Sequence, residues 1–205
     1  MDWARNRYVT MSLLEVKQQV LLVGHSGVGK TVLIEGMLRE QDQNTLTFTV
    51  NFSAGTLSGG CQEIIESYYD KRAKNKFKPK NSKQKAICFI DDLNMPRADT
   101  YGFQPPIELL RQWIDYGFWY DQARVVKNWI CDFQILAAMG KPGAGRQPMA
   151  NRMLSKFHLL NFTVPSNQQM QRIFETIAHV KFAQFFEEIK SLIEPIAIST
   201  VSLFN

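Results

Sequence analysis

The sequence predicts an α/β fold in which a parallel sheet of five strands is flanked by helices. Short apolar segments alternate along the chain with longer amphipathic ones, as in proteins that alternate strands and helices. Several of the short segments are apolar throughout, which is typical of strands covered on both faces. The first of them enters a glycine-rich turn, LLVGHSGVGKT at 21–31, and an amphipathic segment follows.

Five segments are expected to be the strands because they are short and rich in β-branched or aromatic residues. They are QVLLVG (19–24), TLTFTV (45–50), AICFID (86–91), CDFQILAAM (131–139) and FHLLNF (157–162). Helices are expected between them and after them. Their ranges are 29–40, about 56–70, 105–116, about 148–155, and a segment that begins at Ser166.

The segment after Ser166 has a helical start signal and an apolar stripe. Ser166 is a favourable N-cap, and Met170, Ile173, Phe174 and Ile177 recur at helical spacing. Farther along, Pro195 is expected to lie at the end of a helix, and the residues after it to form an untethered terminus.

Bulk composition is that of a globular domain. The chain has 205 residues, of which 45% are hydrophobic and 21% charged. No stretch approaches the roughly 18 apolar residues of a membrane span, and the first residues do not resemble a signal peptide, so we expect neither membrane association nor secretion. Cys61, Cys88 and Cys131 are odd in number and widely spaced, which indicates a reducing compartment and no metal site.

The segment Gly24-His25-Ser26-Gly27-Val28-Gly29-Lys30-Thr31 matches the phosphate-loop (Walker A) pattern G-x-x-x-x-G-K-[ST]. Glycines let the backbone curl so that its N–H groups point at phosphate oxygens, and the following helix adds its positive end. Lys30 would reach the β- and γ-phosphates, and the Thr31 hydroxyl would ligate Mg²⁺. A chance glycine-rich turn is the alternative, but an apolar strand precedes the loop and an amphipathic helix, starting with Val32, follows it.

An acid pair ends the third predicted strand, in ICFIDDLN. Asp91 is expected to hold Mg²⁺ through water, and Asp92 to orient the water that attacks ATP. Helix capping is the alternative role of the pair. Most nucleotide hydrolases of this kind have Glu in the second position, and Asp92 is one methylene shorter. A misplacement of about 1 Å can cost on the order of 10²-fold in rate.

Longer stretches of sequence resemble one AAA+ module of a dynein heavy chain. They are NFSAGTLSGG (51–60), FIDDLNMPRADTYGFQPPIELLRQWIDYGFWYD (89–121), FQILAAMGKPGAGR (133–146) and NRMLSKFHLLNFTVPSNQQMQRIF (151–174). The likeness runs from about residue 8 to 178 and is greatest to the third module of the motor ring in its axonemal (ciliary) form. It implies an AAA+ fold, a ring of six modules within a longer chain, and movement along microtubules.

The resemblance assigns roles to individual residues. Gly24, Gly27, Gly29, Lys30 and Thr31 match the nucleotide loop, Asp91 and Asp92 match the acid pair, and Asn94 follows in the family pattern. Val9 and Thr10 fall where such modules pass the chain near the adenine. Arg152 matches an arginine that acts in trans on the nucleotide of a neighbouring module. A helix-surface Arg in a salt bridge is the alternative role of Arg152.

Other positions depart from the family pattern. Gly140 stands where AAA+ proteins often place a polar sensor near the γ-phosphate, and it has no side chain to do this. GKPGAG (140–145) is interpreted as a flexible turn, and Arg146 after it as an interface residue or a solvated one. The helical lid is only begun, so the chain is expected to be a fragment or a truncated isoform.

We therefore expect residues 1–165 to be the large nucleotide-binding subdomain and 166–205 a partial helical lid. The expected function is that of an ATP-binding, regulatory module of a dynein motor, with ATP or ADP and Mg²⁺ as ligands. The resemblance implies other modules of the same chain, dynein intermediate and light chains and microtubules as partners, and a cytoskeletal, axonemal location. A structural module with negligible hydrolysis is the alternative. A free-standing nucleic-acid-dependent ATPase is a weaker one.

Two further segments could bind partners. The stretch 71–85 has eight Lys or Arg residues and no acid, and without it the rest of the chain would be net acidic. A solvated loop is the favoured interpretation of it, over a site for nucleic acid or acidic tubulin tails, because Phe77 is its only aromatic. The segment 117–129 is expected to be an inserted hairpin whose aromatics, Phe118, Trp119, Tyr120 and Trp129, pack a small core or present a partner surface.

Overall fold

A computed structural model describes residues 2–81, 83–121 and 124–204. The chain divides into two compact units, one up to Phe162 and one from Thr163 onward. The boundary expected from the sequence lay between residues 165 and 166. Among the described residues, no helix combines the length and the apolar character needed to cross a membrane.

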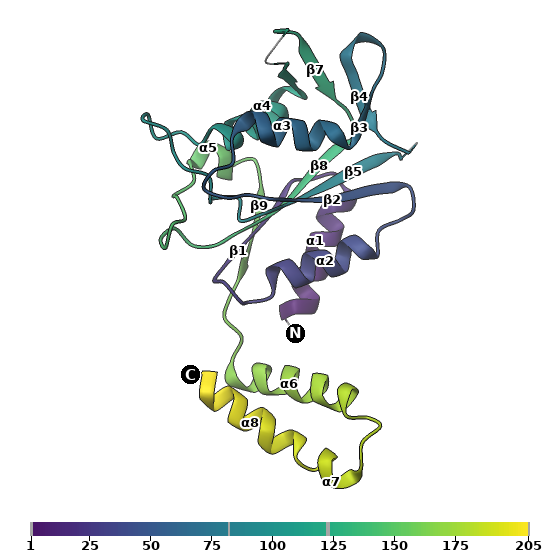
Figure 1. Cartoon of the computed structure of the whole chain (residues 1–205), viewed down its shortest axis with the longest axis vertical. Coiled ribbons are helices and arrows are strands. Elements are labelled where there is room, and N and C mark those ends of the chain that lie inside the picture. Colours follow the sequence, from purple (N-terminus) through teal and green to yellow (C-terminus); the bar gives the residue numbers. More distant parts are fainter. Residues whose placement is uncertain (1, 82, 122–123, 205) are drawn as a thin grey trace. The chain divides into compact units, whose positions relative to one another are not determined.

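The first unit is built on a parallel sheet of five strands (Figure 1). Its strands are β1 (Val20–Gly24), β2 (Thr45–Asn51), β5 (Lys85–Asp91), β8 (Phe133–Met139) and β9 (His158–Phe162). They lie in the order β2-β5-β8-β1-β9, and every neighbouring pair is parallel. The predicted sheet is confirmed, because each predicted strand forms within two residues of its expected start.

Helices cover both faces of this sheet, which explains why its central strands β1, β5 and β8 are buried along most of their length, whereas the edge strands β2 and β9 are partly exposed (Figure 1). Successive residues of β5 point to opposite faces, so Ile87 and Phe89 join one buried cluster while Cys88 and Ile90 join the other. The first cluster contains residues of α1 (Asp2–Glu15) and α2 (Lys30–Arg39). The second contains residues of α3 (Ser58–Ser67), α4 (Pro105–Tyr116) and α5 (Asn151–Leu154).

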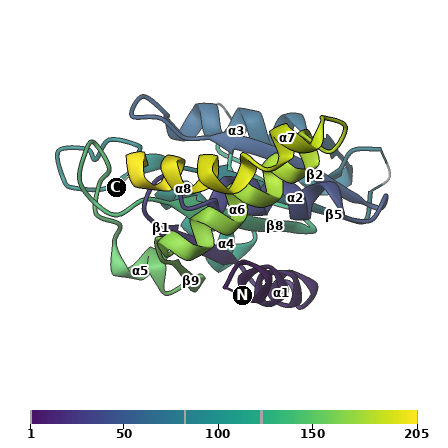
Figure 2. The ribbon, with the colours of Figure 1, turned by 90° about the horizontal axis from the view of Figure 1, so that it is seen from below.

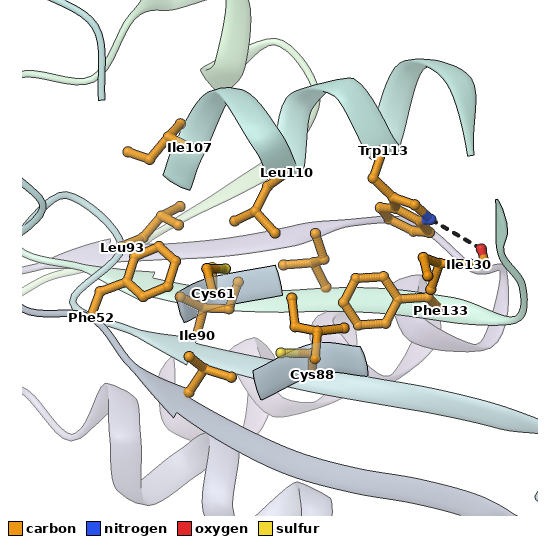
Figure 3. Packing of buried hydrophobic residues seen from close by; sticks show 14 of the residues in the cluster. Phe52, Cys61, Cys88, Ile90, Leu93, Ile107, Leu110, Trp113, Ile130 and Phe133 are labelled. Atoms are coloured by element: carbon orange, nitrogen blue, oxygen red, sulfur yellow. Dashed lines mark hydrogen bonds between the residues drawn. The ribbon is translucent and has the colours of Figure 1, made fainter. Parts of the chain in front are cut away.

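Aromatic packing fixes α4 on the sheet (Figure 3). Trp113 packs edge-on against Phe133 of β8, with ring centroids 4.5 Å apart, and its indole Nε1 donates a hydrogen bond of 3.1 Å to the Ile130 carbonyl. Leu110, one turn earlier, is fully buried in the same cluster. The helix ends at Gly117, whose φ of 76° is a left-handed conformation that glycine adopts without strain.

A second sheet lies in the same unit, in the order β3-β4-β7-β6. Its strands are β3 (Tyr69–Lys71), β4 (Lys76–Pro79), β6 (Phe118–Tyr120) and β7 (Lys127–Ile130), with a short 3-10 turn, η1 (Ala73–Asn75), between β3 and β4. The predicted inserted hairpin is confirmed as antiparallel β6 and β7, although residues 122–123 at its tip lie outside the described residues. Trp119 is fully buried, whereas Tyr120 and Trp129 are exposed.

The prediction of a solvated loop at 71–85 is wrong for Lys76–Pro79, which form strand β4, although the lysines of that strand are solvent-exposed as expected. The residues alternate, with Lys76 and Lys78 exposed and Phe77 and Pro79 buried, as expected of a strand with one covered face. Hydrogen bonding to the nearby β3 on one side and to β7, a distant segment of the chain, on the other holds the lysine-rich strand in place. The helix expected over 56–70 also ends early, at Ser67, because Tyr69 enters β3. Ser82 lies outside the described residues.

Helix α1 was not expected from the sequence. The one expectation for this region was that Val9 and Thr10 lie near the adenine, as the family resemblance implies. Its covered face is narrow, with Leu14 and Thr10 buried and Trp3 and Tyr8 exposed. A weak apolar stripe of this kind is a poor helix signal. Contacts with α2 support the helix, including an ion pair between Arg7 and Glu40.

The second unit contains α6 (Asn167–Lys181), α7 (Glu187–Lys190) and α8 (Ile193–Phe204), with α6 and α8 packed side by side (Figures 1 and 2). The predicted Ser166 N-cap is confirmed as a full capping box, since the Gln169 side chain also accepts from the Ser166 N–H. The interpretation of Pro195 as the end of a helix is wrong. Pro195 lies in the first turn of α8, where its missing N–H costs no hydrogen bond.

Candidate nucleotide-binding site

The phosphate loop follows β1 and leads into α2, as predicted. Gly27 and Gly29 have φ of 79° and 88°, left-handed conformations that residues with a Cβ adopt only at a cost. Gly24 is needed for a different reason. A Cβ at this position would lie 2.5 Å from the carbonyl oxygen of Phe162 in the neighbouring strand β9. The loop is therefore shaped both by its own turns and by close packing against the sheet.

Lys30 is folded into this loop. Its Nζ donates hydrogen bonds of 2.9 Å to the Gly24 carbonyl and 2.7 Å to the His25 carbonyl. Burial lowers the pKa of Lys30, while the nearby Asp91 carboxylate acts in the opposite direction. Because the hydrogen-bond partners of Nζ are neutral carbonyls, the ammonium of Lys30 keeps a positive charge that can bind an anion.

The other loop residues differ in how accessible they are. His25, Ser26 and Gly27 are exposed, and Val28 and Gly29 are half-buried. An open loop of this kind leaves backbone N–H groups accessible to a ligand. Val32, also predicted as a contact, is 70% exposed on the first turn of α2.

The predicted metal ligands Thr31 and Asp91 are in direct contact. The Thr31 hydroxyl donates a hydrogen bond of 2.9 Å to Asp91 Oδ2, and the Asp92 N–H donates one of 2.9 Å to Asp91 Oδ1. A hydroxyl and a carboxylate fit Mg²⁺, which binds few protein ligands and completes its shell with water and phosphate oxygens. No group of three or more His, Cys, Asp or Glu side chains in the described part of the chain could hold a metal.

Asp92 has a partner that sequence reasoning missed. Arg146 donates to Asp92 Oδ1 from Nη2 at 3.0 Å and from Nε at 3.2 Å. Asp92 itself has a left-handed φ of 50°. From the sequence alone, Arg146 is interpreted as an interface residue or a solvated one. The missing side chain at Gly140 was the one available signal, since it leaves room that another side chain can fill.

Asn94 is a second residue whose role the sequence did not specify. It is buried, and its Nδ2 donates to the carbonyls of Gly140, at 2.9 Å, and Gln147, at 3.3 Å. Asn94 thus ties together the two ends of the loop that contains Arg146. The interpretation of GKPGAG as a flexible turn is incomplete, because Gly143 and Arg146 exchange two backbone hydrogen bonds across a tight turn.

Val9 and Thr10, predicted near the adenine, lie on α1. Thr10 is fully buried, and its hydroxyl donates a hydrogen bond of 2.7 Å to the Asn6 carbonyl in the preceding turn. Val9 is half-buried. The Thr10 hydroxyl is therefore used within the helix, and the contact of this segment with adenine stays a prediction.

Arg152 lies on α5 and makes contacts within its own chain. It forms an ion pair of 2.7 Å with Glu108 of α4, and its guanidinium lies 4.7 Å from the centre of the Phe103 ring. The salt bridge expected by the alternative interpretation is therefore present. About half of the side chain remains exposed, and action in trans on a neighbouring module stays a prediction.

A phosphate loop after β1 meets an acid from β5 across the intervening strand β8. Together with the strand order, this arrangement is that of a P-loop domain of the AAA+ type. Residues 1–165 match the family model of the P-loop containing dynein motor region, so the chain belongs to that family.

The curated relatives are dynein heavy chains. The chain is 44% identical over its full length to the Dynein-1-beta heavy chain, flagellar inner arm I1 complex, of Chlamydomonas reinhardtii, of which it covers 4%. It is 40% identical over its full length to Dynein axonemal heavy chain 2 of Homo sapiens, of which it covers 5%. For Dynein axonemal heavy chain 6 of Homo sapiens the identity is 38%, again with 5% covered. The chain thus spans about a twentieth of the length of these relatives.

Proposed function

We propose that the chain is an ATP-binding module of an axonemal dynein motor. The observation that supports this most directly is the hydrogen bond between Thr31 and Asp91, beside the buried ammonium of Lys30. In this proposal the loop N–H groups and Lys30 hold the phosphates of ATP or ADP. Thr31 and Asp91 hold Mg²⁺, which neutralises phosphate charge when it is bound.

The proposed place of the module is the third position of the motor ring, in a regulatory role. Residues 166–205 would be the start of its helical lid. Arg152 would leave Glu108 and act on the nucleotide of a neighbouring module, a role that suits its exposed half. The partners would be other modules of the same heavy chain and, through the whole motor, intermediate and light chains and microtubules in the axoneme.

A structural module that binds nucleotide with negligible hydrolysis is the second candidate. Two observations favour it. The Asp92 carboxylate, expected to orient water, is engaged by Arg146, and Asp92 is shorter than the usual Glu. Arginine fingers are worth about 10³–10⁵ in rate, so a module without one turns over slowly at most.

A nucleic-acid-dependent ATPase is the third candidate function, and the structure removes one of the features that would support it. Phe77, the one aromatic of the lysine-rich stretch, lies in β4 with its side chain buried in the core, so it cannot stack on a base. The exposed lysines of β4 leave only charge for such binding.

Binding and turnover separate these candidates. Titration calorimetry of the 205-residue chain with ATP and ADP, with and without Mg²⁺, tests the proposal, which requires Mg²⁺-enhanced ATP binding. Absence of binding to either nucleotide would refute it. Turnover that appears when neighbouring modules are added supports the regulatory module, and none under any condition supports the structural one. A salt-sensitive gain on adding RNA or DNA would favour the third candidate.

A further inference from the structure

The side chain of Arg146 occupies the space above Gly140. A Cβ at position 140 would lie 2.6 Å from Arg146 Nε and 2.7 Å from its Cδ, closer than real side chains approach. Gly140 directly follows β8, the strand between β1 with its phosphate loop and β5 with its acid pair. Glycine at 140 and arginine at 146 therefore depend on each other: the first makes the room and the second fills it.

The loop that holds Arg146 has a defined conformation, which is fixed by a tight turn and by hydrogen bonds. Ala144 and Gly145, with φ of 49° and 86°, form a tight two-residue turn, and Gly143 and Arg146 exchange hydrogen bonds of 2.9 and 3.0 Å across it. Gln147 N–H also donates to the Asn94 carbonyl at 2.9 Å, which complements the bonds made by the Asn94 side chain. Arg146 is thus positioned against the carboxyl edge of the sheet.

Its guanidinium lies among the groups of the phosphate site. It pairs with Asp92, and its positive charge is one of the influences that lower the pKa of Lys30. Two cations, Lys30 and Arg146, thus face two acids, Asp91 and Asp92. Both hydrogen bonds from Arg146 end on a single oxygen of Asp92, so the pair lacks the two-oxygen geometry of a strong arginine–carboxylate fork.

We infer that Arg146 binds the terminal phosphate of the ATP held by its own module. It would thereby take the role of the polar side chain that is absent at Gly140. In the structure, Arg146 is paired with Asp92. When ATP is bound, the guanidinium exchanges the single carboxylate oxygen for γ-phosphate oxygens, and Asp92 is released to orient water. ADP has no γ-phosphate and leaves the pair in place. This inference rests on the proposed ATP site.

The ratio of ATP to ADP affinity tests the inference, because a residue that only supports Asp92 would not change it. In Arg146→Gln, Mg-ATP affinity should fall about 10- to 100-fold, the effect of one or two hydrogen bonds to a charged group, while ADP affinity should change less than twofold. Arg146→Lys should restore part of the ATP affinity. Lys141→Gln removes an exposed cation from the same loop and should change neither affinity.

A second variant approaches the same contact from the other side. Gly140→Ala places a methyl group against the guanidinium and should lower ATP affinity selectively, with thermal melting as the control for folding. Equal losses for ATP and ADP in Arg146→Gln, or no loss for either, would overturn the inference while the proposed function stands. Failure of the unsubstituted chain to bind either nucleotide would instead refute the proposed function itself.

Discussion

Thr31 and Asp91 are separated by sixty positions in the chain, yet the hydroxyl of one donates to the carboxylate of the other at 2.9 Å. The strands that lead to them, β1 and β5, are not neighbours, because β8 lies between them. The first turn of α2 brings Thr31 across β8 toward the end of β5. The two proposed metal ligands are therefore brought together by the order of the strands and the position of α2, although they lie far apart in the sequence.

Substitution of Lys30 is expected to remove nucleotide binding and leave the fold in place. In Lys30→Ala the phosphates lose their point charge, and two carbonyls lose a charged donor. We expect Mg-ATP affinity to fall at least about 100-fold, and the melting temperature to fall by less than about 10 °C. Arg39→Ala, at the exposed far end of α2, is the matched control. Unchanged affinity, or loss of the cooperative melt, would contradict this assignment.

The two acids are expected to separate by function. Asp92→Asn should retain Mg-dependent ATP binding, because Asp91 is the acid that contacts Thr31. Any turnover should slow by about 10²-fold or more, the usual contribution of a positioned base. Asp91→Asn should instead lose the effect of Mg²⁺ on binding. Calorimetry with and without Mg²⁺ measures both, and loss of the Mg²⁺ effect in Asp92→Asn would mean that the roles are reversed.

The five strands and the phosphate loop were predictable because their signals are local. Each strand is a short segment rich in apolar, β-branched or aromatic residues, and the loop pattern fixes glycine, lysine and threonine within eight positions. The second sheet was not predictable in the same way, since its β3–β4 hairpin joins the β6–β7 hairpin only through the pairing of β4 with the distant β7. Its alternation of lysine with buried residues is a strand signal, but the density of positive charge favoured a loop.

In the candidate site, too, the residues of local motifs were predictable from the sequence, whereas contacts that depend on the tertiary fold were not. Lys30, Thr31 and Asp91 lie where their motifs placed them. The pairing of Arg146 with Asp92 depends on a turn at Ala144 and on space above Gly140, neither of which a motif describes. The long-range ion pair of Arg152 with Glu108 likewise depends on how α5 packs near α4.

Cysteine alkylation is expected to report on the integrity of the main sheet. Burial raises the pKa of the Cys61 thiol to about 12 and that of the fully buried Cys88 well above its ordinary value. Both should stay protonated and unreactive at roughly pH 8, whereas the partly exposed Cys131 should react first. Mass spectrometry after a timed pulse of iodoacetamide measures this order. Fast labelling of Cys88 in the native chain would show that β5 is not buried as described.

The 205-residue chain alone is expected to bind nucleotide weakly, hydrolyse it barely and self-associate. Large apolar side chains of the second unit are exposed, among them Val180 at 75% and Phe186 at 83%. Light scattering across a concentration series should show association that Val180→Ser with Phe186→Ser reduces. A chain that stays monomeric and turns over ATP at about 1 s⁻¹ or faster, the ordinary range of enzymes, would contradict the expectation.

The second sheet also has a consequence for the order in which the chain folds. Lys76 of β4 pairs in register with Trp129 of β7, and the segment between them contains all of β5 and α4. Closing so long a loop loses conformational entropy before the two strands gain their hydrogen bonds. The main sheet, whose β5 is covered on both faces, is therefore expected to form first, and the pairing of the local β3–β4 hairpin with β7 to form last. In the native protein the amide hydrogens of β4 should exchange with solvent before those of β5, so the inserted sheet would open as a unit of its own while the nucleotide site stays folded.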